Sequence, residues 1–181
     1  KLRDALFLVH PQAKDDAQAE KDRQKALRIA QKDSDRQKRA DEIFMQAAID
    51  EGRRAAAIRE VPIGCVIVRN GRIIARGYNR RNNDKNVLSH AELIAIKEAC
   101  RKTGDWRLEE CTLYVTLEPC PMCAGALGWS QMARIVYGAP DIKRGYRTFA
   151  PLVLHPKTKV TAGVLADDCR DLMLRFFKER R

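Results

Sequence analysis

Hydrophobic positions change their spacing about a quarter of the way along this chain. Residues 13–40 are mostly Ala, Gln, Lys, Arg and Asp with few large apolar side chains, which is typical of a solvated helix or a loosely attached arm. From Ile43 onward, apolar side chains recur at helical spacing, which predicts an amphipathic helix that ends before Pro62. We therefore expect a charged, helical N-terminal extension, residues 1–40, followed by a folded domain, residues 41–181.

Beyond that helix, strand-like and helix-like segments alternate. Two β-branched runs about an Asn70-Gly71 turn predict a β-hairpin over residues 64–79. The remaining expected elements are a helix over 90–102, a strand over 111–118, a helix over 121–131, a strand over 133–137, an irregular segment over 141–160 and a helix over 167–181. A hairpin followed by alternating helices and strands predicts an α/β fold of three layers, α/β/α, with helices on both faces of a mixed central sheet.

Length and composition indicate a soluble globular protein. The chain has 181 residues, of which 45% are hydrophobic and 33% charged, and no apolar run approaches the about 20 residues of a membrane helix. No signal segment is recognisable, so a cytoplasmic location and no membrane partner are expected. A targeting segment upstream of Lys1 would lie outside this sequence.

The chain is strongly basic, with a formal net charge of +11. A balance of that size favours a polyanionic partner, and nucleic acid is the commonest one. Residues 1–40 contribute eleven basic and seven acidic side chains. For this extension, a solvated charged helix is favoured over a dedicated RNA-binding arm.

Two of the six cysteines have the spacing of a functional pair. Cys120 and Cys123 follow a strand and a Pro-Cys-Pro turn, which places both at the N-terminus of a helix, where thiolates are favoured. The same arrangement is typical of redox dithiols, so the motif alone leaves open a redox pair, a metal site or two core thiols.

A second motif, Ser-His-Ala-Glu over residues 89–92, separates these alternatives. Alone, it predicts a capping box with Ser89 as the N-cap and Glu92 at the third helical position. Together with the cysteines, His90 completes a set of one imidazole and two thiolates, which suits zinc and leaves a fourth position for water. Glu92 would then be placed to accept a proton from that water.

These residues carry a family resemblance. His90-Ala91-Glu92 and Pro119-Cys120-Pro121-Met122-Cys123 together resemble the H-x-E … P-C-x-x-C signature of the zinc-dependent cytidine deaminase superfamily. Within it, residues 41–181 are similar to the bacterial tRNA-specific adenosine deaminases, including segments 59–64, 112–127 and 163–169.

The resemblance implies a cytidine deaminase-like fold and hydrolytic deamination of adenosine to inosine at the wobble position of a tRNA anticodon. It implies one zinc ion per chain on His90, Cys120 and Cys123, with Glu92 as the catalytic proton shuttle. It also implies a homodimer, binding to the tRNA anticodon stem-loop, and substrate contacts from Asn79, Asp141, Ala91 and Val61. Asp141 would touch the RNA backbone beside the target base.

Basic and aromatic side chains are interleaved in residues 142–159, a pattern that suits a splayed single-stranded loop. The candidate RNA contacts are Lys143, Arg144, Arg147, Tyr146, Phe149 and, at the C-terminus, Arg180. The alternatives are a zinc-dependent deaminase of a free nucleobase or nucleotide, of the guanine or cytosine type, a dithiol oxidoreductase, and a catalytically silent RNA-binding module.

Overall fold

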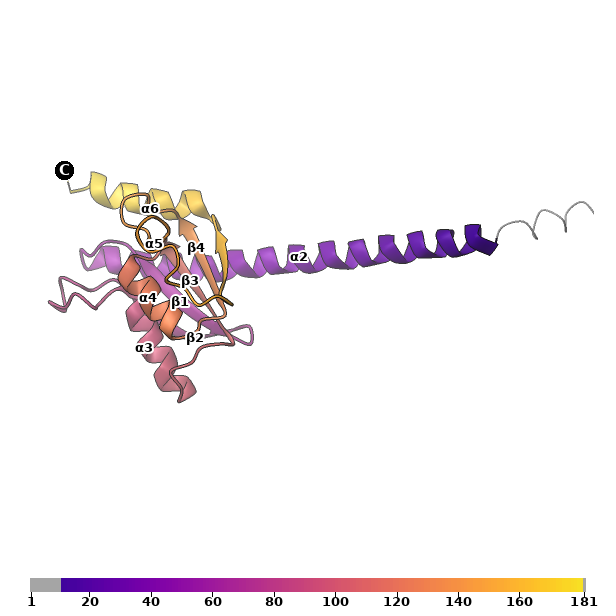
Figure 1. Ribbon diagram of the computed structural model, residues 1–181. Coiled ribbons are helices and arrows are strands. Elements are labelled where there is room, and N and C mark those ends of the chain that lie inside the picture. The colour runs from indigo at the N-terminus through magenta and orange to yellow at the C-terminus, as the bar shows by residue number, and fades with distance from the viewer. Residues whose placement is uncertain (1–10, 181) are drawn as a thin grey trace, which may run out of the picture. The chain divides into compact units, whose positions relative to one another are not determined.

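The computed structural model describes residues 11–180, and side chains from residue 18 onward (Figure 1). The chain divides into two compact units between Ala40 and Asp41. Helix α2, Pro11–Ala57, runs through both units, and its part beyond Asp41 packs into the second. Residues 18–39 are exposed throughout, as the polar composition of this segment predicts.

The second unit is built on a five-stranded sheet in the order β2-β1-β3-β4-β5. Strands β1 and β2 form the expected hairpin, and both residues of its turn, Asn70 and Gly71, have positive φ angles of 51° and 69°. Strand β3 pairs antiparallel to β1 and parallel to β4, so the sheet is mixed. The strands are β1 Gly64–Arg69, β2 Arg72–Tyr78, β3 Cys111–Leu117, β4 Arg134–Ala139 and β5 Lys159–Ala162.

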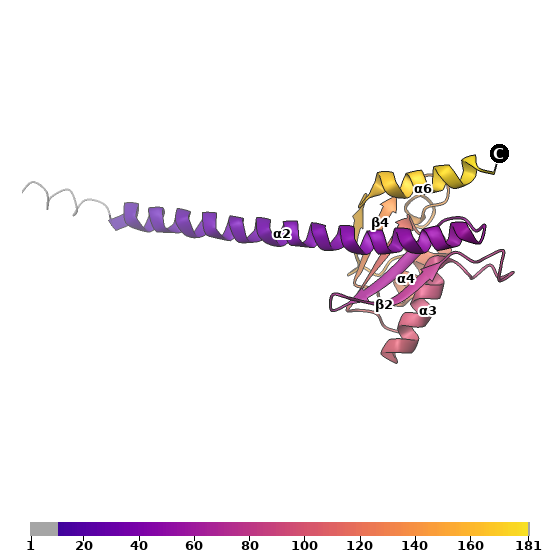
Figure 2. The ribbon, with the colours of Figure 1, turned by 180° about the vertical axis from the view of Figure 1, so that it is seen from behind.

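Helices cover both faces of this sheet, and the predicted three layers are confirmed. Helices α3, Ala91–Thr103, and α4, Pro121–Trp129, lie over one face, whose core includes Ile67, Leu113 and Leu127. On the other face, residues 41–57 of α2 and helix α6, Ala166–Lys178, enclose a second core (Figure 2).

The segment over 141–160 is more regular than predicted. It contains a short helix, α5, Tyr146–Phe149, and its last two residues are the first two of the edge strand β5. Because β5 has only four residues and a largely exposed burial pattern, it lacks the hydrophobic alternation that marks a strand in sequence. No helix within residues 11–180 is both long and apolar enough to cross a membrane.

Candidate active site

Two helix N-termini bring the predicted metal ligands together. His90 is the N-cap residue of α3, and Cys120 is the N-cap residue of α4, which begins with Pro121 in its first turn. Both caps have extended backbone, with φ and ψ of −80° and 149° at His90 and −71° and 166° at Cys120. Cys123, in the first turn of α4, then projects from the same end of that helix as Cys120.

The three side chains form a compact cluster. The Nδ1 atom of His90 lies 3.8 Å from the Sγ atom of Cys120 and 3.5 Å from the Sγ atom of Cys123. All three candidate ligand atoms lie within 4.8 Å of one another. Among the described residues, no other group of three or more His, Cys, Asp or Glu side chains could hold a metal ion in this way. One imidazole and two thiolates fit Zn²⁺, whose preferred ligands are nitrogen and sulfur in tetrahedral geometry.

The two cysteines differ in acidity. Hydrogen bonds from Cys123 and from the His90 ring lower the pKa of Cys120 to about 4, although partial burial opposes this shift. The pKa of Cys123 is raised well above its ordinary value, first by its hydrogen bond to Cys120 and then by burial. A bound cation favours the thiolate at both positions, because a coordinating thiol is deprotonated.

Glu92 lies in the first turn of α3, two residues beyond His90. Its side chain is 4% exposed, and its Oε2 atom is the buried side-chain oxygen with no hydrogen-bond partner within the described part of the chain. Burial raises the pKa of Glu92 to about 7. A buried carboxyl with an unoccupied oxygen beside a metal-type cluster has the properties of a group that exchanges protons with a bound molecule.

The predicted capping box is wrong. Helix α3 starts one residue later than expected, with the Ile94 amide donating to the carbonyl of His90, and no side chain caps this end. The Ser89 hydroxyl instead donates to Asp84 at 2.9 Å. Glu92 is therefore not needed to cap the helix, and its carboxyl group remains available to the site.

A pocket of about 490 Å³ opens beside the cluster and contains several of the predicted residues. The part of its lining that was predicted consists of Val61, Asn79, His90, Glu92, Cys120, Asp141, Lys143 and Arg144. The part that sequence reasoning missed consists of Ile63, Arg81, Leu117, Glu118, Met173 and Phe177. The last two come from α6, so the C-terminal helix closes one side of the pocket. Ala91 does not line it but is fully buried in the core below.

Asn79 is held in the pocket by a buried acid that the sequence did not reveal. Glu60 is fully buried, and one of its oxygens accepts a hydrogen bond from the Asn79 amide at 3.4 Å. The other accepts bonds of 2.8 and 3.0 Å from the backbone and side chain of Asn83. With its amide nitrogen committed to Glu60, Asn79 keeps its side-chain oxygen for other partners, and none is present within residues 18–180. An isolated Glu between a helix and a strand gives no sequence signal of such a role.

A second buried acid organises the loop after β4. Glu118 accepts a hydrogen bond from the Asp141 amide at 3.2 Å and one from the Arg147 amide at 3.1 Å. The Asp141 carboxylate in turn accepts from the amides of Lys143 and Arg144, each at 3.0 Å. Asp141 therefore shapes the backbone that presents these two cations at the pocket.

The other candidate RNA contacts lie in different surroundings. Tyr146 is buried, and burial raises its pKa. Arg147 is exposed, but its guanidinium donates to the Tyr137 hydroxyl at 2.7 Å. Phe149 is 63% exposed. Arg180 donates to the Arg59 carbonyl, stacks on Phe176 at 4.2 Å and lines a separate pocket.

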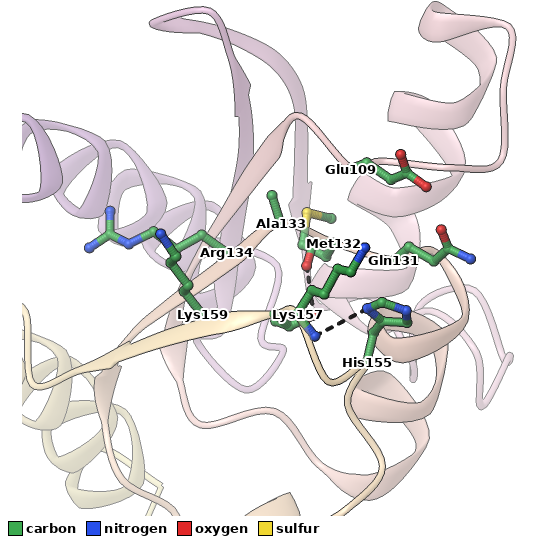
Figure 3. Close-up of a pocket in the computed structure, with 9 residues that line it drawn as sticks. Glu109, Gln131, Met132, Ala133, Arg134, His155, Lys157 and Lys159 are labelled. Atoms are coloured by element: carbon green, nitrogen blue, oxygen red, sulfur yellow. Dashed lines mark hydrogen bonds between the residues drawn. The ribbon is translucent and has the colours of Figure 1, made fainter.

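A further pocket lies at the opposite end of the parallel strands, where β4 and β5 begin (Figure 3). His155, Lys157 and Lys159 line it together with Arg134 and the acid Glu109. Apart from Arg147, the basic residues of segment 142–159 are therefore divided between this pocket and the one beside the cluster.

Comparison with known proteins places the cluster in context. Residues 38–139 match the family described as the cytidine and deoxycytidylate deaminase zinc-binding region. Over 146 residues, the chain is 46% identical to a tRNA-specific adenosine deaminase of Bacillus subtilis, covering 78% of this chain and 91% of that protein.

Solved structures show the same architecture. A structure from a study of A-to-I editing by tRNA:A34 deaminases at the wobble position superposes with a TM-score of 0.67 and 40% identity, covering 71% of this chain and 97% of that one. A guanine deaminase from Bacillus subtilis superposes with a TM-score of 0.53 and 38% identity, over 55% of this chain and 64% of that one. The expected cytidine deaminase-like fold is thus confirmed.

Proposed function

We propose that this chain, which belongs to the cytidine and deoxycytidylate deaminase zinc-binding family, deaminates adenosine to inosine at the wobble position of a tRNA anticodon. The chain is a zinc-dependent deaminase, with residues 41–181 as its catalytic domain. One observation carries the chemistry: the buried, unpartnered carboxyl oxygen of Glu92 next to the cluster of His90, Cys120 and Cys123.

In the proposed reaction, Glu92 moves the protons. Zinc held by His90, Cys120 and Cys123 would supply a water molecule acidic enough to lose a proton near neutral pH. Glu92 accepts a proton from the attacking water and delivers it to the adenine ring nitrogen. It then takes the second water proton from the C6 hydroxyl and gives it to the amine, which leaves as the C6 carbonyl forms, so that adenosine and water become inosine and ammonia. A carboxyl whose pKa is raised by burial suits both donation and acceptance near neutral pH.

The pocket residues would select and hold the base. Asn79 is positioned by Glu60 with its side-chain oxygen available, so we infer that it accepts a hydrogen bond from the base. Val61 would pack against the ring, while Ala91 acts from below by filling the core under α3.

Basic side chains at the rim would neutralise phosphates next to the flipped nucleotide. The candidates are Lys143 and Arg144, whose backbone Asp141 positions. Phe149 is exposed and could stack on a base. Tyr146, Arg147 and Arg180 would contact RNA only after leaving their present partners.

The substrate claim has a direct test. The protein is incubated with an anticodon stem-loop carrying adenosine at the wobble position, and separately with adenine, guanine and cytosine as free bases. Inosine formed only in the RNA is the expected result. Turnover of a free base without turnover of the RNA would favour the guanine-type alternative that the second structural relative represents. It would retain the zinc chemistry and overturn the substrate.

We infer further that two copies form a homodimer in the cytoplasm. Large apolar side chains remain exposed on neighbouring segments: Trp129 at the end of α4 is 83% exposed, and Leu152 is 94% exposed. The end of α4 and the segment around Leu152 are in close contact: a Cβ atom placed on Gly128 would lie only 2.3 Å from the Val153 carbonyl oxygen. Exposed apolar surface of this kind is typical of an interface. Light scattering at micromolar concentration should give the mass of two chains.

A further inference from the structure

One face of helix α2 carries an unbroken row of basic side chains. Successive members are three or four residues apart, so at 100° per residue all lie within an arc of about 80°. From its first to its last member the row covers 18 residue steps, or about 27 Å of helix. We call it the basic stripe: Lys21, Lys25, Arg28, Lys32, Arg36 and Arg39, every one of which is exposed.

The acids of the same segment do not neutralise the stripe. Three carboxylates accept hydrogen bonds from glutamine side chains one turn away: Glu20 from Gln24, Asp22 from Gln18 and Asp35 from Gln31, at 3.0 to 3.1 Å. Across residues 18–40, no carboxylate lies within ion-pair distance of a stripe cation; the first acid of α2 in an ion pair within the described residues is Asp41, which pairs with Arg134 of β4. The charge of the stripe therefore faces solvent.

This spacing works against the helix by itself. Each neighbouring pair in the stripe has like charges at i,i+3 or i,i+4, which destabilises an isolated helix by about 0.2–0.5 kcal/mol per pair. A helix that served only as a soluble spacer would be stabilised by alternating signs along the face. Acids three or four residues before Lys25, Arg36 and Arg39 offset part of this repulsion, but they lie outside the arc of the stripe. The face of the stripe itself stays cationic, and an opposing polyanion would relieve the remaining repulsion.

The segment also lacks the features of other partners. Its large apolar side chains are Leu27 and Ile29, exposed by 61% and 53%, and they form no continuous seam for a coiled coil. Two apolar side chains likewise give no face that could enter a lipid interface. Residues 18–40 contain no aromatic side chain that could stack on a base. Phosphate groups are the chemistry that remains.

We propose that the basic stripe binds the sugar–phosphate backbone of the tRNA substrate outside the anticodon loop. This proposal rests on the proposed function, since it assumes that tRNA is the substrate. The contact adds affinity without reading sequence, because phosphate contacts position a nucleic acid and base contacts specify it. It would make full-length tRNA a tighter ligand than the isolated anticodon stem-loop, with a steeper dependence on salt.

The test compares two double variants of the full chain with identical composition. Lys25→Gln/Arg28→Gln removes two stripe charges, whereas Arg23→Gln/Lys38→Gln removes one Arg and one Lys outside the arc. Glutamine preserves helix propensity, which circular dichroism checks.

Dissociation constants are measured for full-length tRNA and for the anticodon stem-loop between 50 and about 300 mM NaCl. The stripe variant should bind tRNA about three- to tenfold more weakly, with a salt slope lower by about 1 to 2. Its stem-loop affinity should match the parent, and the control variant should match the parent with both RNAs.

Several results would overturn the proposal. Equal losses in both variants would indicate net charge rather than the stripe, and equal losses for tRNA and stem-loop would place the contact in the loop. Unchanged tRNA binding with lost binding to phosphatidylserine vesicles would identify a lipid surface instead. Stem-loop deamination in the parent protein is scored separately. If it persists while the stripe variant behaves as the parent, the stripe proposal fails and the proposed function stands.

Discussion

Arg134, the first residue of β4, donates two hydrogen bonds of 2.7 Å to the carboxylate of Asp41 in α2. The Tyr114 hydroxyl of β3 donates a third to the same carboxylate at 2.8 Å, and Arg134 also reaches the Thr161 hydroxyl of β5. The side chain of Asp41 is 6% exposed and that of Arg134 is 19% exposed. This pair fastens one helix to three adjacent strands.

Removing the acid should be costly. Asp41→Ala leaves a largely buried guanidinium without its counter-charge, and we expect it to lower the free energy of unfolding by about 3–5 kcal/mol in urea. The matched control is Asp50→Ala, in the same helix, whose pair with Arg53 is more than half exposed; its cost should be about 0–1 kcal/mol. Equal urea midpoints for the two variants would show that the Asp41–Arg134 pair does not stabilise the packing of α2 on the sheet.

Local patterns predicted most elements but not this pair. The hairpin could be predicted because its turn residues and β-branched runs are adjacent in sequence. Helix α3 could be predicted from the helical spacing of its apolar residues, although its capping box was wrong, and α4 from the proline in its first turn. Asp41 and Arg134 lie 93 residues apart, and neither stands in a motif, so only the folded chain shows that they meet. Strand β5 was missed for the complementary reason, since its burial pattern lacks alternation.

The site divides in the same way. The cluster of His90, Cys120 and Cys123 could be predicted, because zinc chemistry restricts residue type and spacing, whereas the role of Glu92 as proton shuttle stays a prediction. The carboxylates that position the pocket could not. Glu60 and Glu118 lie in segments that resemble the family, but they act through hydrogen bonds to residues 19 to 29 positions away, which the sequence does not show.

Loss of one ligand should release the metal. Cys123→Ser replaces a buried thiol of the cluster, and the zinc content should fall from about one equivalent per chain to a small fraction, with activity lost in parallel. Cys100→Ser is the control, because Cys100 is a partly buried free thiol that lies outside the cluster. Mass spectrometry of the dialysed proteins measures the zinc. Full zinc content in Cys123→Ser would remove this residue from the ligand set.

The proton shuttle can be separated from metal binding. Glu92→Gln keeps the shape of the side chain but cannot accept a proton, so the single-turnover rate of inosine formation should fall about 10²- to 10⁴-fold. Zinc content and affinity for the stem-loop should remain at parent values, because Glu92 is not one of the three clustered ligands. A rate within about threefold of the parent would assign the proton transfer to another group.

Glu60 should make stability depend on acid pH. Burial acts to raise the pKa of Glu60, but hydrogen bonds from the side chain and backbone of Asn83 outweigh it, and the net shift is below the ordinary value of 4.5. Folding therefore favours the ionised form. The stabilisation is complete above the unfolded-state pKa and disappears as pH falls through the lower folded-state pKa.

Glu60→Gln removes this titration while keeping the size of the side chain. Its cost at pH 7 should be about 1–3 kcal/mol, since amides that donate to a charged acceptor would meet a neutral one. The difference from the parent in urea unfolding should shrink as pH is lowered from 6 to 3. A difference that stays constant over this range would show that the Glu60 carboxylate is not favoured by folding. Because Asn79 also loses a partner, the KM for the stem-loop should rise.

Glu118 should govern the rim of the pocket rather than the chemistry within it. Its carboxylate approaches the loop so closely that a Cβ on Gly145 would stand 2.5 Å from it, and it accepts the amides of Asp141 and Arg147. Glu118→Ala leaves two amides without an acceptor, which costs about 1–3 kcal/mol each if they stay buried and otherwise loosens the loop. We expect the KM for the stem-loop to rise about tenfold with a smaller change in kcat, because Lys143 and Arg144 lose their fixed positions.

The control is Glu110→Ala, which removes an exposed carboxylate paired with Arg69 and should leave both KM and kcat unchanged. A fall in kcat at constant KM in Glu118→Ala would instead place Glu118 in the chemical step.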